Sequence, residues 1–389
     1  MPENFTRHPS TVADWSGARR KARLRETRLG HDWQRLGRAR RVLAWLALCL
    51  IPVFVLCGQY WIEDVHPERE RLSRTHPQIH HIYDARTPAD SRTAVVDLVG
   101  LGNLDASETA RTLSAYAGIG QVWAVEYDNG GIDTAVISRM IVASAAQTGT
   151  DNIILSGHSM GGVIALEVAQ HIHEDSDTVL VGVVLDSTPV DLHAVRAESR
   201  DAGEDMLRWI GWLPGARESR SLRLLVETAA RKDTFLDTHS TWYPRIDLSE
   251  LQVVIGEVVH DKILSDDAAS NGLIQSQFET IVASGAIDNL KSLAAERSGR
   301  VSPGIVFVRP RVGERDPVVD VDYTQRILVE QVGGPDGSLL VARLAGIGHA
   351  NPNQQPALYN AAIDKRILPF LRQVLVQADR ADRLSAGIR

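Results

Sequence analysis

A serine set between glycines is the first feature of this sequence that could do chemistry. Ser159 lies in the run Gly157-His158-Ser159-Met160-Gly161-Gly162, after the apolar residues 153–155 and before an apolar stretch that starts at Val163. This order predicts a strand, a sharp turn and a helix, with the small glycines letting strand and helix approach closely. Such a turn strains the serine backbone and lifts the hydroxyl clear of the sheet. Ser159 is therefore a candidate nucleophile.

A serine hydroxyl needs a base within hydrogen-bond reach, and the base needs a carboxylate to orient it. His349 follows the last predicted strand in the glycine-rich turn 346–352, so it should reach the sheet edge where Ser159 lies. Asp316 follows the preceding strand in a similar turn. Asp186, just after a valine-rich strand, is the runner-up for the carboxylate. Glu314 and Asp320 are further alternatives.

Residues 157–162 resemble the nucleophile elbow of the α/β-hydrolase family, in its serine esterase and lipase-like form. The chain order Ser159, Asp316, His349 matches the order of the catalytic residues in that fold. The run 313–319 also resembles the family's acid loop, which favours Asp316. More loosely, the resemblance extends from about Thr93 to Val376. It implies a doubly wound, mostly parallel α/β sheet.

By the same resemblance, the backbone N–H groups of Leu101 and Met160 form an oxyanion hole. Leu101 lies in the glycine-containing turn 99–103, and Met160 follows the candidate nucleophile directly. No histidine precedes Gly100, which departs from the family's usual pattern. The implied chemistry requires no metal and no organic cofactor.

Strands alternate with helices from residue 93 to 185, which predicts parallel βαβ units. The pattern breaks over residues 187–300, which are mostly helical in period, and we expect a helical cap over Ser159 there. Its aromatic residues either form the core of the cap or line an apolar acyl pocket: Trp209, Trp212, Phe235, Trp242 and Tyr243. Strands over 304–308 and 338–344 and a last helix over 354–376 complete a hydrolase domain predicted at 93–376. A tail at 377–389 follows, which we expect to be frayed from Arg380 onward.

Residues Val42–Ile62 contain no formal charge, and about 20 apolar residues span a bilayer as a helix. Arginines precede this run and an acidic segment follows it, so the positive-inside rule predicts a cytoplasmic N-terminus and an extracytoplasmic catalytic domain. A cleaved signal peptide would have a shorter apolar region and a small-residue cleavage site. A buried core helix would need an amphipathic surface. We therefore predict a single-pass membrane anchor.

The charge distribution argues against nucleic acid as the main partner. Residues 1–41 hold eleven Lys and Arg against four Asp and Glu, a net charge of about +7, whereas the whole chain carries −7. The remainder is therefore strongly acidic. We interpret residues 1–41 as a basic cytoplasmic arm and residues 63–92 as a polar linker. Cys49 and Cys57 both lie in the apolar run and offer no disulfide framework.

A serine at the elbow limits the reaction to acyl transfer, because members of this fold that open epoxides or displace halide carry an aspartate there. The sequence thus predicts a membrane-anchored serine hydrolase that cleaves an ester in a small-molecule or lipid acyl substrate. An acyltransferase, a thioesterase or a peptidase could use the same residues. A non-catalytic binding protein of this fold is a further alternative, although a degenerate copy would be expected to lack one of the three residues.

Overall fold

The computed structural model describes residues 17–27, 31–32, 37–237, 245–263, 265, 268–295, 301–333 and 338–387. The chain divides into two compact units, Met1–Glu63 and Asp64–Arg389. The first unit contains the helices α1 (Gly17–Glu26) and α3 (Arg38–Gln59). The second unit contains the sheet and the candidate site.

Helix α3 consists almost entirely of the apolar run found in the sequence. Among the described residues, one continuous helical stretch, Arg38–Leu72, is long and apolar enough to cross a membrane by length and composition. None of the residues in α3 is buried, and Phe54 in its middle is 72% exposed. The chain continues through a π-helical turn, Tyr60–Val65, into the short helix α4 (His66–Leu72).

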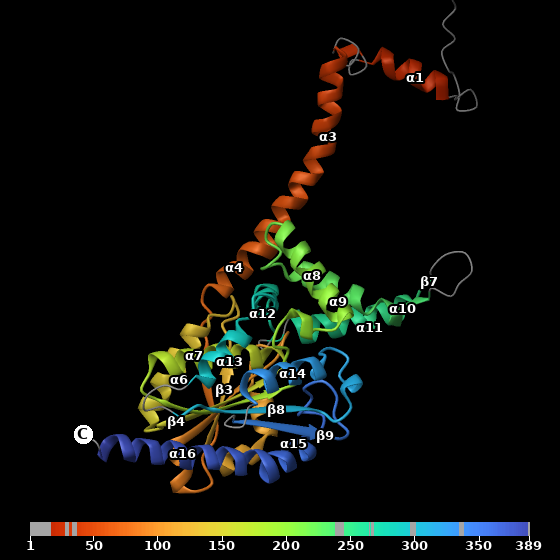
Figure 1. The fold of residues 1–389 in the computed structure, drawn as a ribbon. Helices are drawn as coiled ribbons and strands as arrows, with labels where there is room; N and C mark the ends of the chain where they lie inside the picture. The colour runs from red at the N-terminus through yellow and green to blue at the C-terminus, as the bar shows by residue number, and fades with distance from the viewer. Residues whose placement is uncertain are drawn as a thin grey trace, which may run out of the picture. The chain divides into compact units, whose positions relative to one another are not determined.

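The described part of the second unit is built on a seven-stranded sheet with the order β1-β3-β2-β4-β5-β8-β9. Figure 1 labels β3, β4, β8 and β9 of this sheet. All neighbouring strands are parallel except β1, which pairs antiparallel with β3. The doubly wound, mostly parallel sheet expected from the sequence is therefore present. The strands are β1 (Gln78–Tyr83), β2 (Thr93–Leu98), β3 (Gln121–Glu126), β4 (Asn152–His158), β5 (Val179–Asp186), β8 (Gly304–Pro310) and β9 (Leu339–Leu344).

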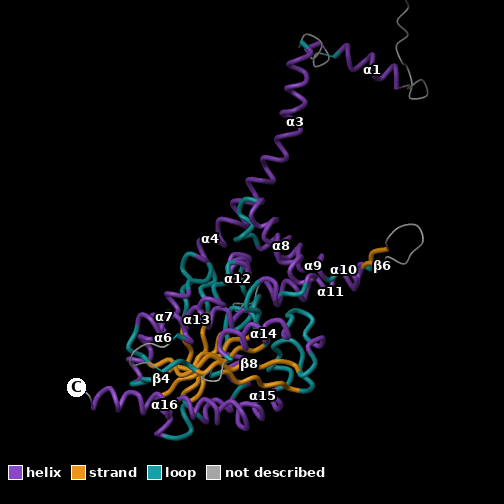
Figure 2. Tube along the Cα trace, in the orientation of Figure 1, coloured by secondary structure: helices purple, strands orange, loops and turns teal. Residues whose placement is uncertain are grey.

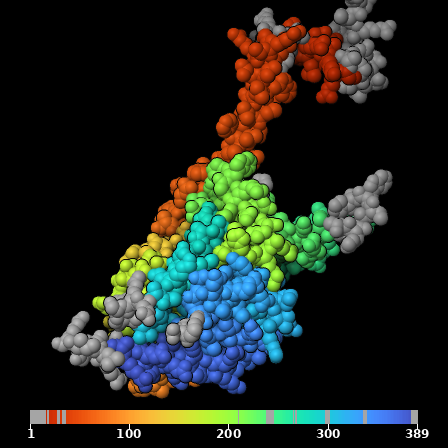
Figure 3. All heavy atoms as spheres, viewed as in Figure 1, coloured from red at the N-terminus to blue at the C-terminus, as the bar shows by residue number. Residues whose placement is uncertain are grey.

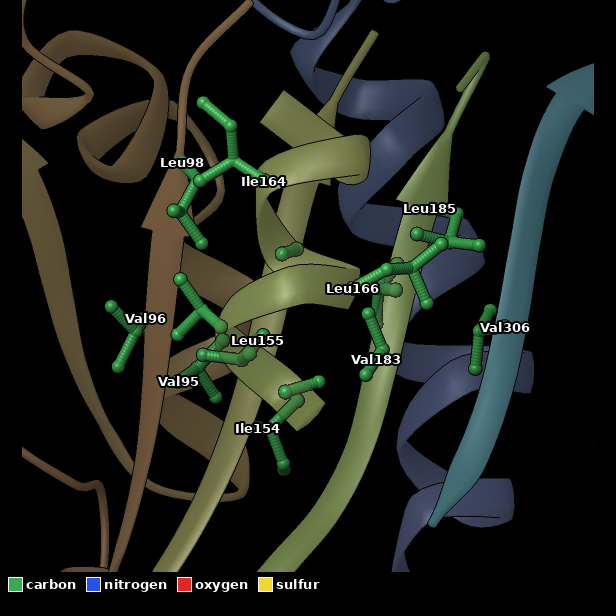
Figure 4. Close-up of a cluster of buried hydrophobic side chains, with 14 of the residues drawn as sticks. Val95, Val96, Leu98, Ile154, Leu155, Ile164, Leu166, Val183, Leu185 and Val306 are labelled. Carbon is green, nitrogen blue, oxygen red and sulfur yellow. The ribbon is translucent and has the colours of Figure 1, made fainter. Parts of the chain in front are cut away.

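The central strands are buried on both faces, which explains their near-continuous aliphatic sequences. Val95, Ile154, Val183 and Val306 lie on four successive strands from β2 to β8 and are fully buried (Figure 4). Each such side chain contributes about 1.5–3 kcal/mol when it is removed from water. The carboxyl ends of these strands meet at one edge of the sheet, so the loops that follow them lie close together.

Helices surround the sheet, as Figure 2 shows with strands in orange and helices in purple. Helix α7 packs on β4 and β5, while α16 contacts β5 and β8 from the opposite side (Figure 1). The helices that accompany the sheet are α5 (Ser107–Thr112), α6 (Thr134–Thr148), α7 (Met160–Asp175), α14 (Val321–Val332), α15 (Pro356–Ala362) and α16 (Leu368–Gly387).

A long, mainly helical segment separates β5 from β8, and we refer to residues 187–303 as the insertion. In Figure 3 its green and cyan surface adjoins the light-blue surface of the residues that follow β8. Helices α12 and α13 of the insertion also pack on α7 of the main body. Its elements are α8 (Ala197–Trp212), α9 (Arg220–Ala230), α10 (Lys232–Phe235), β6 (Leu236–Asp237), β7 (Arg245–Ile246), α11 (Leu248–Val258), α12 (Asn271–Val282) and α13 (Ala286–Ala294).

Two of the predicted boundaries are wrong. The predicted linker at 63–92 contains α4 and β1, and β1 is an edge strand of the sheet. Its half-buried sequence lacks a long apolar run, and only Ile79, Ile82 and Tyr83 pack against the core, which is why the sequence pattern missed it. The predicted end of the last helix at residue 376 is also wrong, because α16 continues to Gly387.

Substituting a glycine in the turn after β4 directly tests how closely this turn packs against the end of β2. A Cβ at Gly161 would collide with the backbone carbonyls of Leu98 and Val99, which cannot move without distorting β2. We expect Gly161→Ala to lower the free energy of unfolding by about 1–3 kcal/mol or more, measured by urea denaturation.

Gly256 is the matched control, because it lies in α11 and a Cβ there would meet nothing within 4 Å. Gly256→Ala should leave the stability unchanged or raise it by about 0.5–1 kcal/mol through helix propensity. Equal stabilities of the two variants would contradict the close strand–helix contact.

Candidate active site

Ser159 occupies the sharp turn between β4 and α7. Its backbone has φ 53° and ψ −123°, a conformation that L-residues other than glycine rarely adopt. The turn is held because the N–H of Ser159 donates to the carbonyl of Asp186 at 2.8 Å, and the N–H of Gly162 donates to the carbonyl of Ser159 at 3.0 Å. The predicted strained strand–turn–helix is thus present.

The structure brings His349 and Asp316 to this serine. His349 Nε2 lies 2.8 Å from Ser159 Oγ, and His349 Nδ1 lies 3.0 Å from Asp316 Oδ2. Because Nδ1 faces a carboxylate, it carries the ring proton and donates it, which leaves Nε2 as the acceptor for the serine hydroxyl. The three residues therefore form a continuous hydrogen-bond relay, although they come from three separate loops.

Asp316 is completely buried at the end of this relay. Its second carboxylate oxygen accepts from the N–H groups of Val318 at 3.0 Å and Val319 at 2.8 Å. Burial by itself would raise the pKa of Asp316, but the hydrogen bond from His349 and these backbone N–H groups outweigh it and hold the pKa below its ordinary value. The carboxylate is therefore charged at neutral pH.

The rival carboxylates have other partners. Asp186 Oδ2 lies 2.9 Å from Nδ1 of His158, and Asp186 Oδ1 accepts from the hydroxyl of Tyr359 at 3.2 Å. Asp320 accepts from the N–H groups of Asp322 and Tyr323 and caps α14. Glu314 is exposed. Asp316 is thus the carboxylate that contacts His349.

His158, the residue before Ser159, forms a buried charged group that the sequence analysis did not foresee. Its Nδ1 contacts Asp186, and its Nε2 lies 3.0 Å from Oδ1 of Asp97 on β2. Both ring nitrogens face carboxylates and both donate, so the ring is an imidazolium. Burial would lower the pKa of His158, but the charge of Asp97 and the hydrogen bonds to both carboxylates outweigh it and raise the pKa to about 10.

A cavity of about 440 Å³ opens beside Ser159 and His349, within the range of small-molecule sites. One wall is apolar and combines residues of the insertion with residues of the loop after β8: Val195, Phe278, Ile281, Val318 and Val319. Another part is lined by amide side chains: Asn103, Asn351, Asn353 and Gln354. The cavity can therefore take a ligand that has both apolar and polar parts.

The aromatic residues expected to line an acyl pocket lie elsewhere or outside the described residues. Trp212 is 74% exposed, and Phe235 is half-buried in α10. Trp242, Tyr243 and the side chain of Trp209 lie outside the described residues. Phe278 is the aromatic residue that lines the cavity in the described part of the chain, and its sequence context offers no signal that distinguishes it from a core residue.

The two residues expected to form an oxyanion hole flank the serine. Leu101 lines the cavity together with Ser159, and a Cβ at the neighbouring Gly100 would lie 3.3 Å from Cβ of Ser159. Met160 is the first residue of α7 and its side chain is buried. The first N–H groups of a helix have no partner within the helix, so the backbone of Met160 is suited to bind an anion.

The model of the alpha/beta hydrolase family matches residues 78–362. The chain belongs to the α/β-hydrolase family. The match begins at β1, which agrees with the place of that strand in the sheet. Membership in this family supports hydrolase activity. No curated protein matches the sequence significantly.

Solved structures with the α/β-hydrolase fold resemble the chain only distantly. The monoacylglycerol lipase of Paleococcus ferrophilus is 13% identical with a TM-score of 0.44, and covers 76% of this chain and 99% of its own. The enol-lactonase of Burkholderia xenovorans LB400 is 13% identical with a TM-score of 0.47, and the alignment covers 76% of this chain and 97% of the enol-lactonase. The proline iminopeptidase of Mycobacterium smegmatis is 14% identical with a TM-score of 0.42, and the alignment covers 78% of this chain and 95% of the iminopeptidase.

The buried imidazolium predicts how the stability of this α/β hydrolase depends on pH. Because the folded-state pKa of His158 is raised from 6.5 to about 10, its stabilising contribution is complete below about pH 6.5 and is lost as the pH rises through about 10. The stability advantage of the wild type over His158→Asn should therefore shrink between these two pH values, as measured by urea unfolding.

His260 is a suitable control, since its side chain is 87% exposed and lies in the insertion. His260→Asn should stay close to the wild type at every pH. A difference between wild type and His158→Asn that is constant with pH would show that the ring is not charged in the folded state.

Proposed function

We propose that this α/β hydrolase is a serine hydrolase that cleaves an ester in a lipophilic substrate by transferring its acyl group to water. The observation that carries this proposal is the hydrogen-bond relay from Ser159 Oγ through His349 to Asp316. A histidine held in this tautomer can accept the serine proton, and a buried carboxylate can stabilise the imidazolium that forms. The apolar wall of the neighbouring cavity supports a lipophilic acyl group.

The proposed reaction proceeds in two halves. Ser159 Oγ attacks the acyl carbonyl carbon while His349 Nε2 takes the hydroxyl proton. The negatively charged oxygen of the tetrahedral intermediate is held by the N–H groups of Leu101 and Met160. The bond to the alcohol then breaks, and His349 returns the proton to the leaving oxygen. Water attacks the acyl-enzyme by the same route, releases the acid and restores Ser159.

We also propose that the chain is anchored in the cell membrane by residues Val42–Ile62, with residues 1–41 in the cytoplasm and the hydrolase unit outside. The length and apolar composition of the helix Arg38–Leu72 support an anchor. The cluster of Arg38, Arg40 and Arg41 before the run supports the orientation, because positive charges stay on the cytoplasmic side. The part of the insertion that lines the cavity would act as a cap over the substrate.

The proposed roles can be tested with the detergent-solubilised full chain, a fluorophosphonate probe and a series of p-nitrophenyl esters. The wild type should react with the probe and turn over the esters. Ser159→Ala should abolish labelling and lower kcat by at least about 10⁴-fold, and Asp316→Asn should lower kcat by about 10³–10⁴-fold. Adding an alcohol and analysing the products would separate hydrolysis from transfer to another acceptor.

Asp320→Asn is the matched control, because Asp320 follows the same strand and asparagine caps a helix about as well as aspartate. It should keep kcat within about twofold of the wild type, as expected for a cap substitution that preserves the fold. Folded wild-type protein that neither labels nor hydrolyses any ester would exclude the proposed reaction and favour a binding protein.

The orientation can be tested by treating intact cells with protease. The hydrolase unit, Asp64–Arg389, should be degraded in intact cells, whereas a tag placed before residue 41 should be degraded only after lysis. A hydrolase unit that is protected in intact cells would contradict the proposed topology.

A further inference from the structure

The loop that contains Leu101 is held by a side chain of the insertion. Gln277 lies in α12, and its side chain is fully buried. The N–H of Gly102 donates to Gln277 Oε1 at 2.9 Å, and Gln277 Nε2 donates to the carbonyl of Asn103 at 2.8 Å. A single amide thus satisfies one donor and one acceptor on two successive residues of the loop, which fixes both in position and orientation.

This contact sets the direction of the Leu101 N–H through the peptide plane. Both the backbone N–H and the side chain Nδ2 of Asn103 donate to the carbonyl of Gly100 at 3.3 Å. The carbonyl of Gly100 and the N–H of Leu101 belong to one planar trans peptide and point in opposite directions. Gln277 fixes Asn103 through a hydrogen bond to its carbonyl, and Asn103 in turn fixes the Gly100 carbonyl through two hydrogen bonds. The direction of the Leu101 N–H follows from the direction of that carbonyl.

The loop that contains Asp316 is held by a second side chain of the insertion. Arg196 precedes α8, and its Nε donates to the carbonyl of Asp316 at 2.7 Å while its Nη2 donates to the carbonyl of Gly313 at 3.0 Å. The N–H of Arg196 donates to the carbonyl of Val318 at 2.8 Å. The backbone of the loop is therefore bound by Arg196 at Gly313, Asp316 and Val318, while His349, Val318 and Val319 bind the carboxylate of Asp316.

We propose that Gln277 and Arg196 are positioning residues, through which the insertion sets the geometry of the oxyanion loop and the acid loop around Ser159. The proposal rests on the proposed function. In this view the insertion does more than cover the cavity, since it supplies the polar contacts that align the two loops with the elbow. Neither side chain touches the reacting atoms, so each acts through the backbone that it binds.

The experiment measures the rate and the final extent of fluorophosphonate labelling in the solubilised full chain. Gln277→Met removes both hydrogen bonds and preserves the length of the side chain. Gln275→Met is the matched control, because Gln275 lies in the same helix and its Nε2 contacts Glu279 instead of the loop. A displaced oxyanion loop lowers the labelling rate, whereas partial unfolding lowers the final stoichiometry.

We expect Gln277→Met to label about 10–100-fold more slowly but to the same final stoichiometry, and to lower kcat per labelled site by a similar factor with little change in KM. Gln275→Met should behave like the wild type. If Gln277→Met folds poorly, Gln277→Glu, which keeps the acceptor for Gly102, should label at an intermediate rate. A wild-type labelling rate in either Gln277 variant would overturn the proposal.

Arg196 is tested in the same assay. Arg196→Met should label about tenfold more slowly, and Arg196→Lys should recover part of the rate, because an ammonium can reach one of the two carbonyls but cannot bind both as the fork of arginine does. Arg200→Met, one turn further along α8, is the control, since Arg200 pairs with Asp201. Labelling of Arg196→Met at the wild-type rate would overturn the role of Arg196. Absence of labelling in the wild type would instead refute the proposed function itself.

Discussion

The site depends on the close contact between the turn after β4, the start of α7 and the end of β2. Gly157, Gly161 and Gly162 have no room for a Cβ, because backbone atoms of the turn and of β2 and the side chain of Thr188 occupy that space. This contact lets Ser159 sit at φ 53° with its N–H bound to the neighbouring strand. The strain in one residue is thus sustained by the packing of three elements.

The buried charges behind the turn reinforce this arrangement. His158 lies between Asp97 on β2 and Asp186 at the end of β5, so one imidazolium joins the ends of three adjacent strands. Removing one member of such a group would leave an uncompensated buried charge, which is strongly destabilising. The same group also explains why Asp186 is not available to His349, although its place in the sequence made it a reasonable candidate.

The insertion joins the parts of the site that the sheet alone does not hold. Gln277 contacts the loop after β2, Arg196 contacts the loop after β8, and Phe278 lines the cavity between them. The insertion and the two loops therefore form one hydrogen-bonded surface around Ser159. A change in the insertion is therefore expected to alter both the shape of the cavity and the positions of the loops that contain Leu101 and Asp316.

The sequence by itself determined the features that depend on local pattern. The apolar strand, the glycines and the apolar helix around Ser159 predict the strained turn, since each is encoded within about 20 residues. The glycine-rich turn of His349 and the order of the strands placed the histidine at the correct edge of the sheet. The uninterrupted apolar run of α3 likewise specifies a membrane-length helix without any tertiary contact.

Only the tertiary structure decided which polar groups meet. The edge strand β1 escaped prediction because it is half-buried and its pairing with β3 does not require a long apolar run. Gln277 contacts Gly102 across 175 positions in the sequence, and Arg196 contacts Asp316 across 120. Such contacts depend on how two distant segments are brought together by packing on the same body, and no periodicity or local motif in either segment encodes them.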